Sequence, residues 1–193
     1  AWWTTPTLPD HQLVAFGRAD DYFFGVLHSR VHETWALELG TRLETRPRYT
    51  PTTCFETFPM PKPTPAQEQA IATAALELNE LRERWLNPPE WTRKEVLEFP
   101  GTPGGPWSRY IEPGTNTVRY PRIVPKDDTT AAFLKKRTLT NLYNERPAWL
   151  DLAHKKLDSA VFAAYGWDPA MTDDELLAAL LELNSKRSIP IND

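Results

Sequence analysis

The stretch from Thr64 to Pro89 constrains the fold more than any other part of the sequence, because it carries the start and the end signal of one helix. Thr64 and Gln67 form a capping box, and a proline occupies the first helical position. The face predicted to be buried consists of Ile71, Ala74, Ala75, Leu78, Leu81 and Trp85. Leu86 is the predicted last residue, because Asn87 precedes a proline and is pushed out of the helical region. The sequence therefore predicts a long helix in this stretch.

Apolar residues at helical spacing predict three further helices. The first covers residues 20–40 as one element, with its apolar residues on a single stripe. The second begins at Pro147 and ends at Gly166. The third begins with another capping box, formed by Thr172 and Glu175. We therefore expect a helix-dominated α+β fold that ends in a C-terminal helical bundle.

The β content is expected to be small. Residues 11–20 alternate well enough for a short strand, and residues 48–63 predict extended chain because they are rich in threonine and aromatic residues. The helix predicted over 20–40 would brace this small β element. Residues 99–128 are rich in glycine and proline and predict an irregular segment, which is either functional or a wrap between two halves.

Composition and charge limit the classes of protein that the chain can represent. It has 193 residues, a net charge of −4 and one cysteine, Cys54, which excludes an internal disulfide and a cysteine-based zinc site. The short apolar runs and the absence of a signal-peptide pattern predict a protein of the reducing cytoplasm that does not span a membrane. The charge is uneven, because Arg42, Arg46 and Arg48 accompany one acidic residue, Glu44. A local basic face on an acidic chain is compatible with nucleic-acid binding.

Asn87-Pro88-Pro89 has the same letters as the motif with which amino-methyltransferases hold an extruded base. That motif lies at the tip of a strand, and an aromatic residue follows its prolines directly. Here a predicted helix precedes the asparagine, Glu90 follows the prolines, and Trp91 comes one place late. We therefore interpret the three residues as a helix stop.

The remaining motifs do not form a complete catalytic set. The glycine-rich residues 101–107 lack the lysine and hydroxyl residue that end a phosphate-binding loop. His28 and His32 are four residues apart on a predicted helix, but the sequence offers no evident third metal ligand. Cys54 and the scattered histidines suggest a buried thiol rather than a nucleophile with its base. A hydrolase that uses these residues is therefore disfavoured.

Residues 42–61 combine arginines, threonine hydroxyl groups and aromatic rings in a segment predicted to be extended. Arginine forks suit phosphates and guanine edges, and threonine can contact either a phosphate or a base. An exposed β-hairpin without a ligand is the alternative that these residues leave open.

The chain resembles the C-terminal part of MmeI-like DNA adenine methyltransferases, which are type IIL or IIG enzymes. Three successive blocks carry the resemblance: DDYFFGVLHSRVHETWA at 20–36, RYTPTTCFETFPMP at 48–61 and TLTNLYNERPAWLDLAHKKLDSAVFAAYGW at 138–167. Such enzymes are large fused proteins of bacterial restriction-modification and phage defence. They carry an S-adenosylmethionine-dependent methyltransferase domain, a target-recognition domain and a helical C-terminal region.

The resemblance implies that this chain recognises double-stranded DNA while the methyltransferase domain of the same parent methylates adenine N6. The cofactor loop would then lie outside this chain, which would bind no cofactor and methylate nothing by itself. Residues 1–63 would be the C-terminal portion of the recognition domain, 64–128 a helix with a wrapping segment, and 129–193 the C-terminal helical region.

The resemblance also implies a set of DNA contacts. They are Arg42, Arg46, Arg48, Tyr49, Thr50, Thr52 and Thr53, with Ser29 and Arg30 near the DNA backbone. No catalytic, cofactor-binding or metal-binding residue is expected in this part. The alternative is a helical scaffold that docks on the methyltransferase domain or on a partner protein and never touches DNA.

Overall fold

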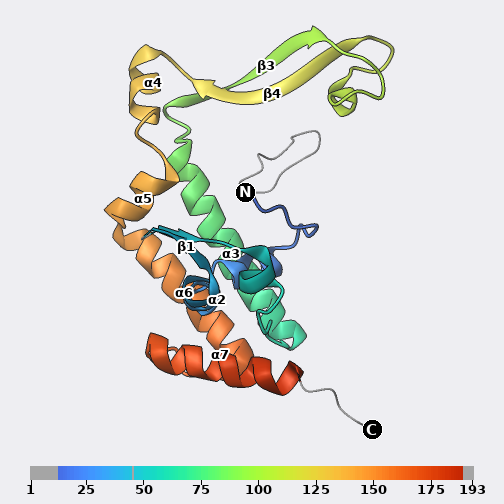
Figure 1. Ribbon diagram of the computed structural model, residues 1–193. Coiled ribbons are helices and arrows are strands. Elements are labelled where there is room, and N and C mark those ends of the chain that lie inside the picture. The colour runs from blue at the N-terminus through green and yellow to red at the C-terminus, as the bar shows by residue number, and fades with distance from the viewer. Residues whose placement is uncertain (1–12, 45, 189–193) are drawn as a thin grey trace. The chain divides into compact units, whose positions relative to one another are not determined.

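The computed structural model describes residues 13–44 and 46–188, and Figure 1 shows their helices and strands. The chain divides into two compact units. One consists mainly of Glu80–Pro147, and the other combines Gly17–Asn79 with the C-terminal stretch from Ala148. The boundary after Asn79 falls inside the longest helix, α3 (Pro65–Leu86). The predicted helix-dominated α+β fold class is confirmed.

The unit that begins at Gly17 is mostly helical. Its helices are α1 (Asp21–Leu27), α2 (Arg30–Leu39), the first part of α3, α6 (Ala148–Tyr165) and α7 (Asp173–Ser188). Between α2 and α3 lie two short antiparallel strands, β1 (Thr41–Leu43) and β2 (Arg46–Arg48), and a π-helical turn (Pro51–Phe55). A small β element next to a bracing helix is what the sequence predicts.

Large apolar side chains from the five helices form the core of this unit. The fully buried ones are Val26, Val31, Trp35, Ile71, Leu78, Leu150, Leu157, Val161, Phe162, Leu176 and Leu180. Gly25 shows how closely α1 approaches α3, because an added Cβ would lie 2.8 Å from Ile71 Cγ2 and 2.9 Å from Ala75 Cβ. Burial of each large side chain contributes about 1.5–3 kcal/mol. Helix packing, rather than the short strands, therefore stabilises this unit.

The helix signals in the sequence are confirmed. The Thr64 backbone N–H donates to Gln67 Oε1 at 2.9 Å, and the Gln67 N–H donates to Thr64 Oγ1 at 3.4 Å, which is the predicted capping box. The box at Thr172 and Glu175 forms in the same way. Gly166 follows the last residue of α6 with a φ of +73°, a conformation that glycine adopts without strain.

The proline-rich segment 58–63 is held by side chains from three helices. Hydrogen bonds run from Tyr165 Oη to the Pro59 carbonyl at 3.0 Å, from Arg187 Nη1 to the Met60 carbonyl at 2.6 Å, and from Tyr22 Oη to the Pro61 carbonyl at 3.5 Å. Prolines have no N–H to give to a strand ladder. The segment therefore lies outside the described strands, and the helices bond the carbonyl groups of Pro59, Met60 and Pro61.

The other unit is dominated by one long hairpin. β3 (Thr92–Pro100) pairs antiparallel with β4 (Thr117–Pro125), and a short 3-10 helix (Ser108–Tyr110) lies in the connection. The helices α4 (Asp128–Leu134) and α5 (Leu139–Glu145) follow the hairpin. Figure 1 shows β3 and β4 as a continuous two-stranded ribbon.

The hairpin corrects part of the prediction of irregular chain over 99–128: residues 99–100 complete β3 and residues 117–125 form β4, whereas residues 101–116 are mostly irregular. Prolines in a sequence usually indicate a loop, but each strand of a two-stranded ribbon is an edge strand. An edge strand tolerates proline where the N–H would point away from its partner. Pro121 lies opposite Val96 within the ribbon.

Two further predictions are corrected in the first half of the chain. The helix expected over 20–40 is two helices, because Ser29 caps α2: its Oγ accepts from the His32 N–H at 3.5 Å and donates to the Val26 carbonyl at 2.7 Å. The extended chain expected over 48–63 is interrupted at Pro51–Phe55, where the Cys54 N–H bonds the Thr50 carbonyl at 2.7 Å.

The strand expected over 11–20 is wrong for the residues that the structure describes. Residues 13–20 form irregular chain. Residues 11 and 12 lie outside the described part.

Candidate nucleic-acid interface

The β1–β2 hairpin places its three arginines on two faces. Arg42 lies opposite Pro47, and Thr41 lies opposite Arg48. Side chains alternate along a strand, so Arg46 and Arg48 share one face while Arg42 belongs to the other. The basic cluster predicted from the sequence is therefore divided.

Arg46 and Arg48 are both exposed. The Arg46 guanidinium lies 3.4 Å from the Glu44 carboxylate, and the Arg46 side chain is still 79% exposed. An ion pair this open is worth little and competes weakly with a phosphate. Glu44 has a φ of 59° in the turn between the strands, a left-handed conformation that is unusual for a residue with a side chain. The result is a tight turn with two available guanidinium groups beside it.

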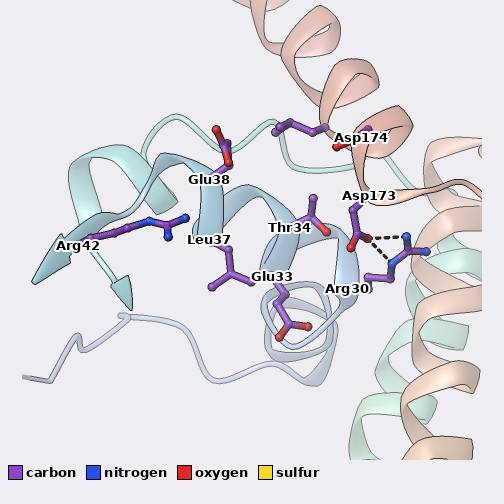
Figure 2. A pocket seen from close by; sticks show the side chains of 9 residues that line it. Arg30, Glu33, Thr34, Leu37, Glu38, Arg42, Asp173 and Asp174 are labelled. Carbon is purple, nitrogen blue, oxygen red and sulfur yellow. Dashed lines mark hydrogen bonds and ion pairs between the residues drawn. The ribbon is translucent and has the colours of Figure 1, made fainter. Parts of the chain in front are cut away.

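Arg42 lines a pocket whose other walls come from α2 and the start of α7 (Figure 2). The pocket carries the carboxylates of Glu33, Glu38, Asp173 and Asp174. The Arg42 side chain extends from β1 toward α2 in this view. Carboxylates repel a phosphate, so the surroundings of Arg42 are less suited to DNA than those of Arg46.

Ser29 and Arg30, which were expected near the DNA backbone, connect helices. Ser29 is fully buried and caps α2. The Arg30 guanidinium donates to Asp173 Oδ1 at 2.9 Å and to the Met171 carbonyl at 2.8 Å, and its backbone N–H donates to Asp158 Oδ1 at 2.7 Å. These bonds tie the start of α2 to α6 and α7.

Tyr49 is half-buried and lies against α2. Its hydroxyl is 2.9 Å from His32 Nε2, and the His32 ring packs edge-on against Phe58 with the centroids 4.5 Å apart. Burial lowers the pKa of His32 to about 4, and burial raises the pKa of Tyr49 to about 12. Both groups are therefore neutral near pH 7, and the bond between them does not depend on charge.

The three predicted threonines differ in what their hydroxyl groups do. The Thr50 hydroxyl lies 2.9 Å from that of Thr41, and the Thr53 hydroxyl donates to the Thr50 carbonyl at 3.4 Å. Thr52 is exposed. Thr52 is therefore the threonine that is best placed to meet a ligand, whereas the other two order the chain after β2.

Gly40 and Cys54 lie close together where the β1–β2 hairpin joins α2, an arrangement that the sequence did not predict. The buried Cys54 thiol accepts from the Thr50 N–H at 3.4 Å and donates to the Ala36 carbonyl at 3.7 Å. A Cβ added to Gly40 would lie 2.5 Å from the Ala36 carbonyl oxygen and 2.9 Å from that of Arg48. A helix-ending glycine and a lone cysteine are the only signals of this arrangement in the sequence.

The β3–β4 hairpin also carries arginines, but they are paired across its strands. Arg122 lies 2.7 Å from the Glu95 carboxylate and Arg119 lies 3.1 Å from that of Glu98. The hydrogen bond from Arg122 holds the pKa of Glu95 below its usual value. These cations are paired with carboxylates on the facing strand, whereas Arg46 has only the longer and more exposed contact with Glu44 in its own turn.

Asn87-Pro88-Pro89 follows the last residue of α3, and the predicted helix stop is confirmed. The Asn87 N–H donates to the Glu83 carbonyl at 2.8 Å, and its side-chain amide donates to the Glu83 carboxylate at 3.3 Å. In the part of the chain that the structure describes, no three His, Cys, Asp or Glu residues come together as a metal site. No described helix combines the length and the apolar composition needed to cross a bilayer.

Three comparisons, two of sequence and one of structure, show which known proteins this chain is similar to. Residues 1–62 match the family described as the MmeI target recognition domain. DNA methyltransferase A of Bacillus subtilis (strain 168) is 29% identical over 167 residues, which cover 86% of this chain and 13% of that protein. A solved structure of the type IIL restriction-modification enzyme MmeI in complex with DNA matches with a TM-score of 0.57 and 26% identity, over 87% of this chain and 16% of that one. The chain thus spans a small part of the length of each relative.

Proposed function

We propose that this chain, an MmeI-like target-recognition segment with the helical region that follows it, recognises double-stranded DNA for a larger restriction-modification methyltransferase. One observation carries the proposal: two exposed arginines share one face of a hairpin that lies within residues 1–62, the range that matches the recognition-domain family. The relative of known structure is described in complex with DNA. Sequence specificity would come from the same hairpin, since base edges are read by side chains on narrow elements that enter a groove.

Arg46 and Arg48 are the proposed principal contacts. Guanidinium groups bind phosphates and guanine edges through two parallel hydrogen bonds, and they stay charged at any physiological pH. Thr52 is exposed close by in the sequence and can donate a further hydrogen bond. Arg42 faces acidic side chains, so we assign it to support of the hairpin.

The remaining members of the predicted contact set support this surface in the proposal. Tyr49, Thr50 and Thr53 order the chain that leaves β2, through hydrogen bonds to other groups of this protein. Ser29 and Arg30 fix the start of α2. The proposed recognition part is 1–63, followed by 64–128 and a C-terminal helical region, 129–193; the family match at 1–62 supports the first boundary.

The chemistry in this proposal belongs to the larger protein. The similarity to a DNA methyltransferase supports DNA methyl transfer by a methyltransferase domain of the same parent chain, for which we propose S-adenosylmethionine as the donor and adenine N6 as the acceptor. The residues described here do not fit that cofactor, because the glycine-rich residues 101–107 connect β3 to a 3-10 helix and Asn87 is bonded to Glu83 at a helix end. A protein that acts on bacterial DNA would work in the cytoplasm.

A second candidate function is a docking scaffold that touches protein rather than DNA. The long hairpin supports it, because Val96 is 48% exposed and Ile123 is 56% exposed. Large apolar side chains in such positions often mark contact surfaces. DNA recognition requires Arg46 and Arg48, whereas the docking scaffold does not.

Duplex binding at a series of salt concentrations tests the proposal. We expect the R46A/R48A variant to bind duplexes of randomised sequence more weakly, with a salt slope reduced by about 0.9 for each phosphate that is no longer bound. The matched control is K155A/K186A, which removes two exposed cations from α6 and α7 of the same unit. Equal binding of the two double variants, or no binding by the wild type at low salt, would favour the scaffold.

A further inference from the structure

The β1–β2 hairpin cannot order itself. Each strand has three residues, and a two-stranded hairpin of this size is at best marginally stable in water. Arg46 directly follows the turn on the second strand, and Arg48 ends that strand opposite Thr41. Besides Arg42, which lines the pocket beside α2, the support for these side chains comes from the foot of the hairpin, which we define as residues 40–41 and 49–50.

The foot is joined to α2 at three points. Tyr49 Oη meets His32 Nε2 at 2.9 Å. The Thr50 N–H meets the Cys54 thiol at 3.4 Å, and the thiol in turn meets the Ala36 carbonyl at 3.7 Å. His32 and Cys54 are both buried and Tyr49 and Thr50 are half-buried, so these contacts are partly shielded from water.

Gly40 is the third and closest point. It ends α2 and directly precedes β1, and its φ of −68° is open to any residue. Space, rather than backbone conformation, is what requires a glycine. An added Cβ would lie 2.9 Å from the Arg48 carbonyl oxygen, 2.5 Å from that of Ala36 and 3.4 Å from Cys54 Sγ.

We propose that Gly40 is a positioning residue for DNA recognition: its missing side chain lets the backbone of Arg48 sit against the end of α2, where the Tyr49–His32 bond and the Cys54 thiol lock the hairpin. The arginines are then presented in one orientation before DNA arrives, which lowers the entropy lost on binding. This inference rests on the proposed function, because it concerns the same two arginines.

The experiment is a double-mutant cycle on the whole chain, read out as duplex affinity and salt slope. Gly40→Ala pushes on the Arg48 carbonyl and changes no charge. We expect it to weaken binding roughly tenfold and to reduce the salt slope as R46A/R48A does. In the R46A/R48A background, Gly40→Ala should weaken binding less than about twofold, because the guanidinium groups that it misplaces are already absent.

Gly17→Ala is the matched control, since nothing lies within 4 Å of the Cβ that it would add. Tyr49→Phe and Cys54→Ser cover the case in which Gly40→Ala unfolds the chain. Tyr49→Phe removes one point of attachment and should reproduce part of the loss of affinity. Cys54→Ser keeps a group that can accept from Thr50 and should bind more tightly than Cys54→Ala.

The outcomes separate this inference from the proposed function. If R46A/R48A leaves binding unchanged, the proposed function is wrong. If R46A/R48A weakens binding but Gly40→Ala and Tyr49→Phe do not, the function stands and the positioning role is wrong. A Gly40→Ala loss of affinity of equal size in both backgrounds would also overturn it, since a general packing defect behaves in that way.

Discussion

The two hairpins of this protein are stabilised by different contacts: one by a neighbouring helix, the other by its own strands. The β1–β2 hairpin is short, its outward arginines are poorly neutralised, and its foot is fastened to a helix by buried groups. The β3–β4 hairpin has nine residues in each strand, and its strands are joined by ion pairs. At its far end Trp107, Tyr110 and Tyr120 pack together near the fully buried Val118, with the Trp107 and Tyr120 centroids 5.1 Å apart.

The difference shows what a recognition element requires. Charged groups that are already paired with neighbours must lose those partners before they bind a phosphate. The short hairpin leaves its guanidinium groups exposed and is held in place by contacts with α2. The long hairpin is held in place by contacts between its own side chains. The first arrangement favours a ligand, and the second favours a self-contained arm.

Removal of a large buried side chain from α2, the helix that holds the short hairpin, should have the largest effect on the free energy of unfolding. Trp35 is fully buried on α2 and packs against Phe58, which also contacts His32. We expect Trp35→Ala to cost about 3–5 kcal/mol of unfolding free energy, as large buried side chains do. Denaturant unfolding measures this cost. Trp107→Ala, at the end of the long hairpin, is the comparison, and it should cost clearly less because Trp107 is 37% exposed. Equal costs would show that the two hairpins do not differ in their support.

Acidification should separate the two hairpins next. The folded-state pKa of His32 is about 4, below the usual 6.5. Between these two pH values His32 is protonated in the unfolded chain and neutral in the folded chain. Stability from His32 is therefore complete above pH 6.5 and is lost as the pH falls toward 4, by about 3 kcal/mol in total. Unfolding curves measured between neutral pH and the folded-state pKa of His32 test this.

The control for the pH experiment is His32→Gln, which should flatten the curve between pH 6.5 and 4. The long hairpin should respond in a lower window. The pKa of Glu95 is depressed by Arg122, so its ion pair persists below pH 4.5 and is lost only as the pH falls through that lowered value. As the pH falls, amide protection relative to the intrinsic exchange rate should therefore decrease at a higher pH in β1–β2 than in β3–β4.

The two faces of the short hairpin predict unequal arginine effects. We expect Arg48→Ala to weaken duplex binding about fivefold to tenfold, because one charge-assisted hydrogen bond is removed. Arg42→Ala should weaken it less than about twofold, since Arg42 lines the acidic pocket on the opposite face. Titration of both variants at one salt concentration makes the comparison. A larger loss of affinity for Arg42 than for Arg48 would reverse the assignment of the two faces.

The sequence predicted the long helices well because their signals are local, whereas it did not predict the short helices α4 and α5. The capping residues Thr64 and Thr172 and the terminal Gly166 act within one turn of the chain, and each is where it was expected. The break at Ser29 was missed because the apolar stripe continues across it. The apolar stripe indicates only which face of the helix is buried. It does not show that the Ser29 hydroxyl caps a new helix and so ends the first one.

The candidate site could be predicted only in part. Its residue types pointed to arginine and threonine, but the division of Arg42 from Arg46 and Arg48 depends on strand register, which a short sequence pattern does not fix. The β3–β4 hairpin was missed because Pro100, Pro121 and Pro125 are tolerated only in edge strands. The convergence of Gly40 and Cys54 joins residues far apart in the chain, and no local pattern encodes it.

The smallest expected effect concerns the ion pairs of the long hairpin. Glu95 and Arg122 lie directly opposite each other, and their carboxylate and guanidinium groups are 2.7 Å apart. We expect Arg122→Ala to lower the unfolding free energy by less than about 1 kcal/mol, because exposed cross-strand pairs are weak. The exchanged variant E95R/R122E should restore only part of the wild-type value, since the pair is rebuilt with its signs reversed but the contact of Glu95 with Arg93, 3.5 Å away, is replaced by a like-charge contact. Neither variant should change duplex affinity by more than about twofold if DNA is held by the short hairpin. A loss of affinity in Arg122→Ala as large as that in Arg48→Ala would instead make the long hairpin a second DNA-binding arm. The contrast between the exposed arginines of the short hairpin and the cross-strand pairs of the long one would then no longer distinguish the two.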